Sequence, residues 1–121
     1  MIRGRRILIV EDDPIALKVL SDIVSNFGYM VEDASTGYEA IETARKKDFE
    51  GVLLDLGLPD MIGIEVLGRL RHLHPTIPIL IVSGRKECER SVLGKGANGF
   101  LLKPFEATAL RDLMAQWFGE P

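Results

Sequence analysis

The chain has 121 residues, a net charge of −3 and a pI of about 5.4. This length suits a single domain with its own buried core and leaves little room for two. The acidic balance argues against direct nucleic-acid binding, because proteins of that class usually carry a basic face. One cysteine excludes an internal disulfide, no apolar run approaches the roughly 20 residues of a membrane span, and the first residues lack the apolar stretch of a signal peptide. We therefore expect one cytoplasmic domain, residues 1–121, without membrane contact.

Five short apolar segments are predicted to be β-strands. Three of them, with the sequences ILIV, VLL and ILIV, show no alternation of apolar and polar residues, which fits strands covered on both faces of a parallel sheet. In chain order the segments are residues 6–10, 30–33, 51–54, 77–82 and 99–102.

Helical periodicity separates these strands. The first such segment repeats apolar residues with a helical period between Ala16 and Phe27 and is followed by Gly28, a plausible stop. Thr36 and Glu39 form a capping-box pattern at the start of the second. The five predicted helices lie within residues 16–27, 36–44, 66–73, 86–94 and 110–118. Strict alternation of strand and helix predicts a doubly wound α/β fold, (βα)5, whose ligands bind at the carboxyl ends of the strands.

Three acids directly follow the first strand. Asp13 precedes Pro14, and proline is favoured at the first position of a helix, so Asp13 is interpreted as the N-cap residue. Glu11 and Asp12 have no comparable local role. Because folding alone disfavours adjacent carboxylates beside a buried strand, we interpret Glu11 and Asp12 as residues of a site.

Other polar residues follow the remaining strands. Asp55 follows the third, Ser83 the fourth and Lys103 the fifth. If the first and third strands are neighbours, Glu11, Asp12 and Asp55 converge. Two carboxylates ~5 Å apart repel by about 3 kcal/mol at an effective dielectric constant of ~20, so a proton or a cation should lie among them. Oxygen ligands without nearby His or Cys favour Mg²⁺ or Mn²⁺.

These residue types are suited to phosphoryl transfer. An aspartate beside a divalent ion can attack phosphorus and form an acyl phosphate, while a lysine offsets the charge on the transferred group. Taken singly, Asp55, Ser83 and Lys103 each also fit an ordinary loop. Their joint placement at successive strand ends favours metal-assisted phosphoryl transfer to Asp55.

Four stretches occur together in this order: ILIVEDDP, VLLDLGLPDMIGIEVL, IPILIVSG and GANGFLLKPF. In this combination, residues 5–118 resemble a bacterial response-regulator receiver domain of the chemotaxis type. The resemblance implies a flavodoxin-like five-stranded sheet of order 2-1-3-4-5, with strands 1 and 3 adjacent where the strand order reverses. It also implies a phosphorylatable switch of a cytoplasmic two-component system, which promotes its own phosphorylation and dephosphorylation and is not otherwise an enzyme.

The resemblance assigns the metal site and the acceptor by motif. Asp55 would be the phosphoacceptor. Asp12 and Asp55 would bind Mg²⁺ with the backbone carbonyl of Gly57, and Glu11 would do so mainly through water.

The resemblance also assigns the switch residues. Lys103 would bind a phosphoryl oxygen, and its peptide bond to Pro104 is often cis in the family. Ser83 would be the hydroxyl that turns inward on phosphorylation, and Phe100 the aromatic ring that moves with it.

The implied partners are proteins. The donor would be a phosphohistidine on a sensor histidine kinase or phosphotransfer protein. A downstream target protein or effector domain would bind the face formed by helix 4, strand 5 and helix 5. A homodimer through helices 4 and 5 is compatible with the resemblance, but we assign Trp117 and Phe118 to the core.

The chain departs from the family pattern around helix 4. The stretch from Ser83 to Lys103 is somewhat short and contains Gly94 and Gly96, each costing roughly 1 kcal/mol inside a helix. We therefore expect a short or mobile helix 4, which keeps open the alternative of a pseudo-receiver, an interaction module without phosphorylation. A metal-dependent phosphatase with an aspartate nucleophile usually has a second acid two residues later, where this chain has Gly57.

Overall fold

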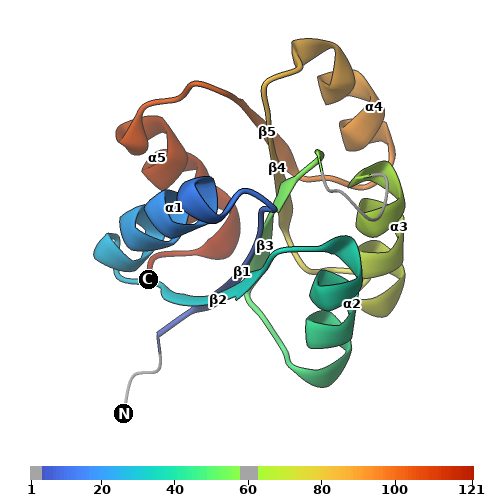
Figure 1. Ribbon diagram of the computed structural model, residues 1–121, viewed down its shortest axis with the longest axis horizontal. Coiled ribbons are helices and arrows are strands. Elements are labelled where there is room, and N and C mark those ends of the chain that lie inside the picture. The colour runs from blue at the N-terminus through green and yellow to red at the C-terminus, as the bar shows by residue number, and fades with distance from the viewer. Residues whose placement is uncertain (1–3, 58–62) are drawn as a thin grey trace.

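In the computed structural model, residues 4–57 and 63–121 are described, and they form five strands and five α-helices in strict alternation. Figure 1 shows the strands as a central sheet flanked by helices on both sides. The elements are β1 (Arg6–Val10), α1 (Pro14–Asn26), β2 (Met30–Ala34), α2 (Gly37–Lys46), β3 (Gly51–Asp55), α3 (Gly63–Leu73), β4 (Ile79–Ser83), a 3₁₀ turn η1 (Lys86–Cys88), α4 (Glu89–Gly94), β5 (Gly99–Leu102) and α5 (Ala107–Phe118).

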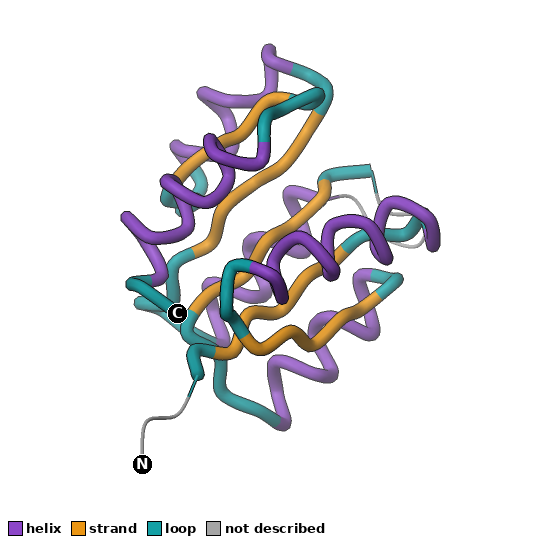
Figure 2. The backbone as a smooth tube through the Cα atoms, turned by 90° about the vertical axis from the view of Figure 1, so that its left-hand side faces the viewer, coloured by secondary structure: helices purple, strands orange, loops and turns teal. Residues whose placement is uncertain are grey.

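The sheet is parallel and has the order β2-β1-β3-β4-β5, which confirms the predicted fold class and strand order. Helices α1 and α5 cover one face, and α2, α3 and α4 cover the other (Figures 1 and 2). The register pairs Val10 with Leu54, Asp55 with Val82 and Ser83 with Leu102. The carboxyl ends of β1, β3, β4 and β5 therefore lie along one edge of the sheet.

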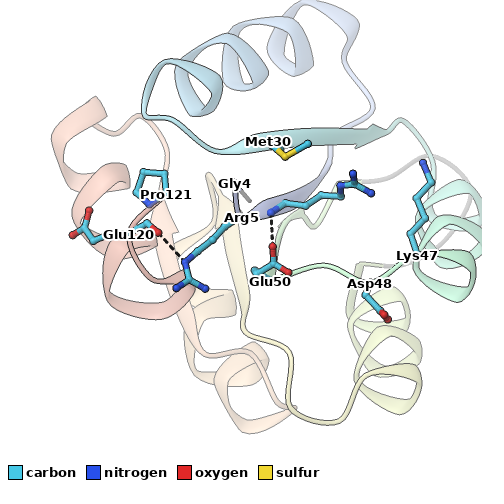
Figure 3. A pocket seen from close by; sticks show the side chains of 9 residues that line it. Gly4, Arg5, Met30, Lys47, Asp48, Glu50, Glu120 and Pro121 are labelled. Atoms are coloured by element: carbon cyan, nitrogen blue, oxygen red, sulfur yellow. Dashed lines mark hydrogen bonds between the residues drawn. The ribbon is translucent and has the colours of Figure 1, made fainter. Parts of the chain in front are cut away.

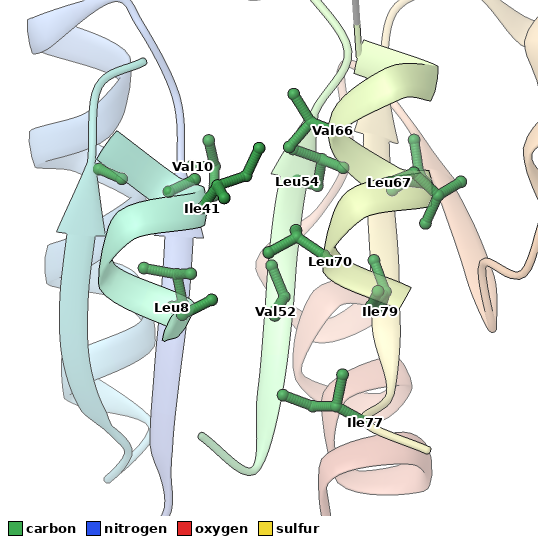
Figure 4. Packing of buried hydrophobic residues seen from close by; sticks show 14 of the residues in the cluster. Leu8, Val10, Ile41, Val52, Leu54, Val66, Leu67, Leu70, Ile77 and Ile79 are labelled. Carbon is green, nitrogen blue, oxygen red and sulfur yellow. The ribbon is translucent and has the colours of Figure 1, made fainter. Parts of the chain in front are cut away.

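Both faces of the central strands are buried, which explains their continuous apolar sequences. Successive side chains of a strand point to opposite faces, so Leu8 and Val10 pack under α2 and α3, whereas Ile7 and Ile9 pack under α1 and α5. Figure 4 shows the first of these layers. Each fully buried Leu or Ile contributes about 1.5–3 kcal/mol through removal of its side chain from water.

The predicted helix starts are confirmed. The Asp13 carboxylate caps α1 by accepting a hydrogen bond from Ile15 N at 3.2 Å, and Pro14 occupies the first helical position. The Thr36 hydroxyl caps α2 by accepting from Glu39 N at 3.0 Å. These contacts assign Asp13 to helix α1 and separate it from its two acidic neighbours.

Three predicted details differ. Strand β4 begins at Ile79 instead of Ile77, after Pro78, which has no N–H to donate to a ladder. Val19, which the periodicity predicted to face the core, has 53% of its surface exposed. Trp117, also assigned to the core, is 37% exposed, whereas the assignment of Phe118 to the core is confirmed.

Helix α4 is as short as predicted. It has six residues and follows the 3₁₀ turn η1, and Val92 is the only buried residue that either element contributes. No side chain caps its first turn. This part of the chain therefore has few contacts that hold it on the sheet.

The edge of the sheet where the strands begin holds the two ends of the chain together. Arg5 Nε donates to the carbonyl oxygen of Glu120 at 2.8 Å, and Arg6 N donates to Glu50 Oε1 at 2.6 Å (Figure 3). The Tyr29 hydroxyl donates to the carbonyl oxygen of Gly119 at 2.7 Å. None of the helices described is both long and apolar enough to cross a membrane.

Candidate functional site

Four of the singled-out residues meet where the parallel strands end. Glu11 follows β1, Asp55 closes β3, Ser83 closes β4 and Lys103 follows β5. The Lys103 amide donates to the carbonyl oxygen of Ser83 at 2.8 Å, which extends the pairing of β5 with β4 up to the site. The expected cis peptide bond between Lys103 and Pro104 is present.

Three acids converge at this edge, as the adjacency of β1 and β3 predicted. Glu11, Asp12 and Asp55 each offer a carboxylate oxygen within 4.8 Å of the others. The Lys103 ammonium donates to Glu11 Oε1 at 3.1 Å and to Asp55 Oδ2 at 3.2 Å. One cation of the chain thus faces three carboxyl groups, which leaves the cluster with an excess of negative charge.

Burial is concentrated at the same place. Among the residues that the structure describes, only two polar or charged ones are buried, Glu11 at 3% exposure and Ser83 at 5%. Buried polar groups are costly unless paired. Both of these energetically unfavourable burials therefore occur at the candidate site.

The carboxyl groups of Glu11 and Asp55 have shifted acidities. Burial and the adjacent Asp55 raise the pKa of Glu11 to about 7, although Lys103 acts in the opposite direction. Burial alone would raise the pKa of Asp55, but hydrogen bonds with Glu11, the Gly57 amide and Lys103 outweigh it and lower that pKa. Without a cation, the pair therefore holds a proton close to neutral pH.

A divalent cation would relieve this excess charge. The donor set consists of carboxylate oxygens, with no His or Cys in the described cluster, and this is the chemistry preferred by Mg²⁺ and Mn²⁺. The raised pKa of Glu11 indicates that a proton otherwise neutralises part of the cluster. These residues fit the predicted metal.

The Asp55 side chain is held in a defined orientation. Its Oδ1 accepts from the Gly57 amide at 2.9 Å, and its Oδ2 accepts from Lys103. Gly57 is exposed, and a Cβ added to it would lie 3.7 Å from Asp55 Oδ1. Asp55 therefore has no side chain beside it at position 57.

Ser83 and Phe100 lie on β4 and β5, and the hydrogen bond and packing that the structure gives them involve other residues than Asp55. Ser83 Oγ accepts from the Arg85 amide at 3.1 Å. Phe100 is half-buried and packs against the core layer under α2 and α3, next to Ile81 in the register. Ser83 therefore bonds the loop that leads into η1 and α4.

An apolar groove next to the acids was missed by the periodicity argument. Its volume is about 580 Å³, and one wall is the exposed face of α1, including Ile15 and Val19, while Pro104 and Phe105 line the other. Glu11 and Lys103 also line it. The exposure of Ile15, at 74%, could not be read from a sequence pattern that marks apolar residues as buried.

A second hollow lies at the opposite edge of the sheet. It has a volume of about 670 Å³ and mixes basic and acidic side chains, among them Lys47 and Asp48, with the exposed Met30 (Figure 3). Among the described residues, the group of acids placed to hold a metal ion is Glu11, Asp12 and Asp55, at the ends of β1 and β3. We therefore assign the candidate site to the acidic edge.

Comparison with known proteins agrees with this geometry. Residues 7–115 match the family model of the response regulator receiver domain. The chain is 36% identical over 117 residues to the transcriptional regulatory protein ZraR of Salmonella typhimurium, covering 94% of this chain and 26% of the relative. It is 41% identical over 101 residues to KdpE of Mycobacterium tuberculosis, covering 82% of this chain and 44% of the relative. The chain thus spans less than half the length of these curated relatives.

Solved structures agree as well. A CheY-like receiver domain protein from Methanospirillum hungatei JF-1 superposes with a TM-score of 0.91 at 33% identity, covering 98% of this chain and 96% of that one. The receiver domain of the sensor histidine kinase PA1611 from Pseudomonas aeruginosa PAO1 superposes with a TM-score of 0.89 at 27% identity, covering 97% and 99%, and that structure has a magnesium ion coordinated in its active-site cleft. The family match, the strand order and the acidic edge lead to one conclusion: this chain belongs to the response regulator receiver domains of two-component signalling.

Proposed function

We propose that the chain is a phosphorylatable switch in which Asp55 accepts a phosphoryl group from a phosphohistidine. The observation that carries the proposal is the position of the Lys103 ammonium, which bonds Asp55 and Glu11 at once beside a third acid, Asp12. A receiver without chemistry has no need of a buried acid held in this way.

In the proposed transfer, a carboxylate oxygen of Asp55 forms a bond to phosphorus while the bond between phosphorus and the imidazole nitrogen of the donor breaks. The imidazole recovers a proton, and Asp55 becomes an acyl phosphate. Hydrolysis of that acyl phosphate by water releases inorganic phosphate and restores the carboxylate. Gly57, which is exposed and places no side chain beside Asp55, supports access of both donor and water.

The residues of this chain have distinct proposed roles. Glu11, Asp12, Asp55 and the carbonyl of Gly57 would hold Mg²⁺, which when bound neutralises charge on the phosphoryl oxygens. Lys103 would offset the remaining charge, because burial would lower its pKa but Glu11 and Asp55 raise it and keep the ammonium charged.

Ser83 and Phe100 are proposed to carry the response. The Ser83 hydroxyl is buried and adjoins the loop to η1 and α4, so a new bond to a phosphoryl oxygen would change how that loop is held. The Phe100 ring, which is half-buried, would move together with Ser83. The response would reach the α4–β5–α5 face, where a target protein or effector domain would bind.

The donor is proposed to be a sensor histidine kinase or phosphotransfer protein. A protein that brings a phosphohistidine to Asp55 must cover the neighbouring surface, and the apolar groove beside α1 offers such a surface next to the acids. Exposed Ile15 and Val19 would then become buried, which accounts for their place on an otherwise solvated face.

The test is incubation with acetyl phosphate and Mg²⁺, followed by the mass of the intact protein. We expect one phosphoryl adduct, which Asp55→Asn abolishes and the matched variant Asp13→Asn retains, because Asn also caps a helix. Failure to form an adduct together with failure to bind Mg²⁺ would favour the pseudo-receiver. Steady turnover of a phosphate ester would favour a phosphatase, which the absence of an acid at Gly57 disfavours.

A further inference from the structure

Arg71, at the end of α3, makes a set of contacts that the site does not explain. Its guanidinium makes six hydrogen bonds to four backbone carbonyl oxygens and one amide oxygen, so at least one of its five N–H groups is shared between two acceptors. Among the described residues, no carboxylate pairs with it. A cation bonded only to neutral acceptors is placed for its geometry, because an ion pair would satisfy its charge more simply.

The first group of acceptors follows α3. Nη1 of Arg71 bonds the carbonyl oxygens of His74 at 3.1 Å and Pro75 at 3.2 Å, and also that of Ile77. The carboxyl end of a helix carries partial negative charge, which suits a cation. His74 Nε2 in turn contacts the carbonyl oxygen of Ala44 at 2.7 Å, at the end of α2. Arg71 is therefore connected to the end of α3 directly and to the end of α2 through His74.

The second group of acceptors lies in the connection from α4 to β5. Arg71 bonds the carbonyl oxygen of Gly96 twice, through Nε at 3.2 Å and Nη2 at 2.7 Å, and Nη2 also bonds Asn98 Oδ1 at 3.0 Å. The same Asn98 oxygen accepts from Ile79 N at 2.9 Å, and Asn98 N donates to the carbonyl oxygen of Ile79 at 2.8 Å. The start of β5 is thus fixed to both β4 and α3.

Gly96 allows this close approach. Its φ is +106°, which favours glycine, and a Cβ there would lie 3.3 Å from Arg71 Nε. The connection therefore turns sharply against the guanidinium before β5 begins.

The segment on the other side of this anchor, residues 84–95, is held much less firmly. Its buried side chain is Val92, and η1 and α4 otherwise lie largely at the surface. Among the described residues, its hydrogen bond to the candidate site runs from the Arg85 amide to Ser83 Oγ, at 3.1 Å. The segment is thus firmly anchored at its end by Arg71 and lightly attached at its start by Ser83.

We propose that Arg71 is a positioning residue that makes Gly96 the fixed pivot of this segment, so that a change at Ser83 moves residues 84–95 and leaves the backbone of β5 in place, while the Phe100 ring on β5 can still turn. The proposal deepens and rests on the proposed function, because the change at Ser83 is the one that phosphorylation of Asp55 would cause. It gives the short α4 a defined mechanical role: the backbone moves at η1 and α4, and within β5 the response is limited to the Phe100 side chain.

The proposal predicts where backbone exchange changes. In the wild type, beryllofluoride with Mg²⁺, which mimics an aspartyl phosphate, should alter amide exchange in residues 84–94 and leave residues 95–100 as they were. In Arg71→Met, which keeps the length of the side chain but removes its donors, exchange in residues 95–100 should rise about tenfold or more and become dependent on beryllofluoride.

The matched control is Arg69→Met on the same helix. The Arg69 side chain is 50% exposed and bonds only Glu65 of the described residues, at 3.3 Å. Arg69→Met should leave the wild-type pattern of amide exchange unchanged, and Arg71→Lys should show part of that pattern. If Arg71→Met does not fold, Asn98→Ala removes the acceptor that Arg71 and Ile79 share. Amide exchange in residues 95–100 should then also rise and depend on beryllofluoride, but by a smaller factor.

A merely structural role is distinguishable. Such a role would lower the melting temperature of Arg71→Met while the beryllofluoride response stayed confined to residues 84–94, and that result overturns the proposal. A wild-type response that runs through residues 95–100 overturns it too. If acetyl phosphate gives no adduct and beryllofluoride no response in any variant, the proposed function itself has failed.

Discussion

Lys103 Nζ lies 3.2 Å from Asp55 Oδ2 and joins the ends of β3 and β5 across the intervening β4. The same ammonium lies 3.1 Å from Glu11. One lysine therefore offsets the charge of two carboxyl groups on neighbouring strands, and its removal should affect metal binding and phosphorylation in opposite directions.

Lys103→Met should bind Mg²⁺ about fivefold to tenfold more tightly, because a positive charge beside the three acids is lost. The same variant should form the acetyl phosphate adduct about tenfold more slowly or worse, because the transferred group loses a counter-charge. Calorimetric titration and time-resolved intact mass measure the two effects. Lys18→Met, whose lysine pairs with Asp22 at the surface, is the control and should change neither. Equal changes in both variants would contradict the assigned role.

Glu11 should make the metal-free protein less stable as the pH rises. In the folded state Glu11 keeps its proton up to a pH of about 7, whereas its ordinary pKa is 4.5. Between these values the folded state binds more protons than the unfolded chain, so the free energy of unfolding should fall by on the order of 1–3 kcal/mol and level off above about pH 7. Asp55, whose pKa is lowered, acts only at the acid end, where its contribution is lost as the pH falls below its ordinary value of 3.8.

Urea unfolding in EDTA between pH 5 and pH 8 checks this slope. This pH interval covers most of the range between the ordinary pKa of Glu11, 4.5, and its raised pKa of about 7. Glu11→Gln should flatten the slope and stabilise the metal-free protein at pH 8, whereas Glu42→Gln at the exposed surface of α2 should keep it. Added Mg²⁺ should restore to the wild-type protein at pH 8 the stability that it loses in EDTA. A wild-type slope of the opposite sign would show that Glu11 is ionised throughout.

Asp12 and Asp13 should separate in function. Asp13→Ala removes the side chain that bonds Ile15 N and should cost about 1 kcal/mol of stability while leaving Mg²⁺ binding intact. Asp12→Asn should weaken Mg²⁺ binding and leave stability nearly unchanged. Thermal unfolding measures the stability of the two variants, and calorimetric titration measures their Mg²⁺ binding. Loss of Mg²⁺ binding in Asp13→Ala would contradict the assignment of Asp13 to the helix cap alone.

Two glycines should respond to alanine in opposite ways. A Cβ at Gly51 would overlap the ring of Phe118, which is buried, so Gly51→Ala should destabilise the fold by roughly 1–3 kcal/mol. Gly68 is exposed on α3 with no atom within 4 Å of an added Cβ, so Gly68→Ala should stabilise by about 1 kcal/mol. Denaturant midpoints of both variants test the packing against α5.

Much of this fold could be predicted because the signals are local or combine by simple topology. The apolar runs of β1, β3 and β4 and the cap residues Asp13 and Thr36 are readable from neighbouring residues. Strand order brings Glu11 and Asp55 together once β1 and β3 are known to be adjacent.

The missed features depend on contacts that no local pattern carries. Val19 on α1 and Trp117 on α5 have the spacing of buried residues, but each lies on a part of its helix that the rest of the fold covers only partly. Arg71 looks like a surface arginine in a last helical turn, because its acceptors include Gly96 and Asn98, which lie far away in sequence. The contact that a Cβ at Gly57 would make with Asp55 Oδ1, at 3.7 Å, likewise depends on the folded geometry.

The bond between Arg5 and Glu120 has a practical consequence for engineering. Because these residues meet at the edge of the sheet that faces away from Asp55, a short linker could join the first strand to the last helix without crossing the acids. A circularly permuted form with new ends in an exposed turn should therefore keep the fold. Reporter proteins could be attached at such ends beside η1 and α4, which would turn a local movement there into an optical signal.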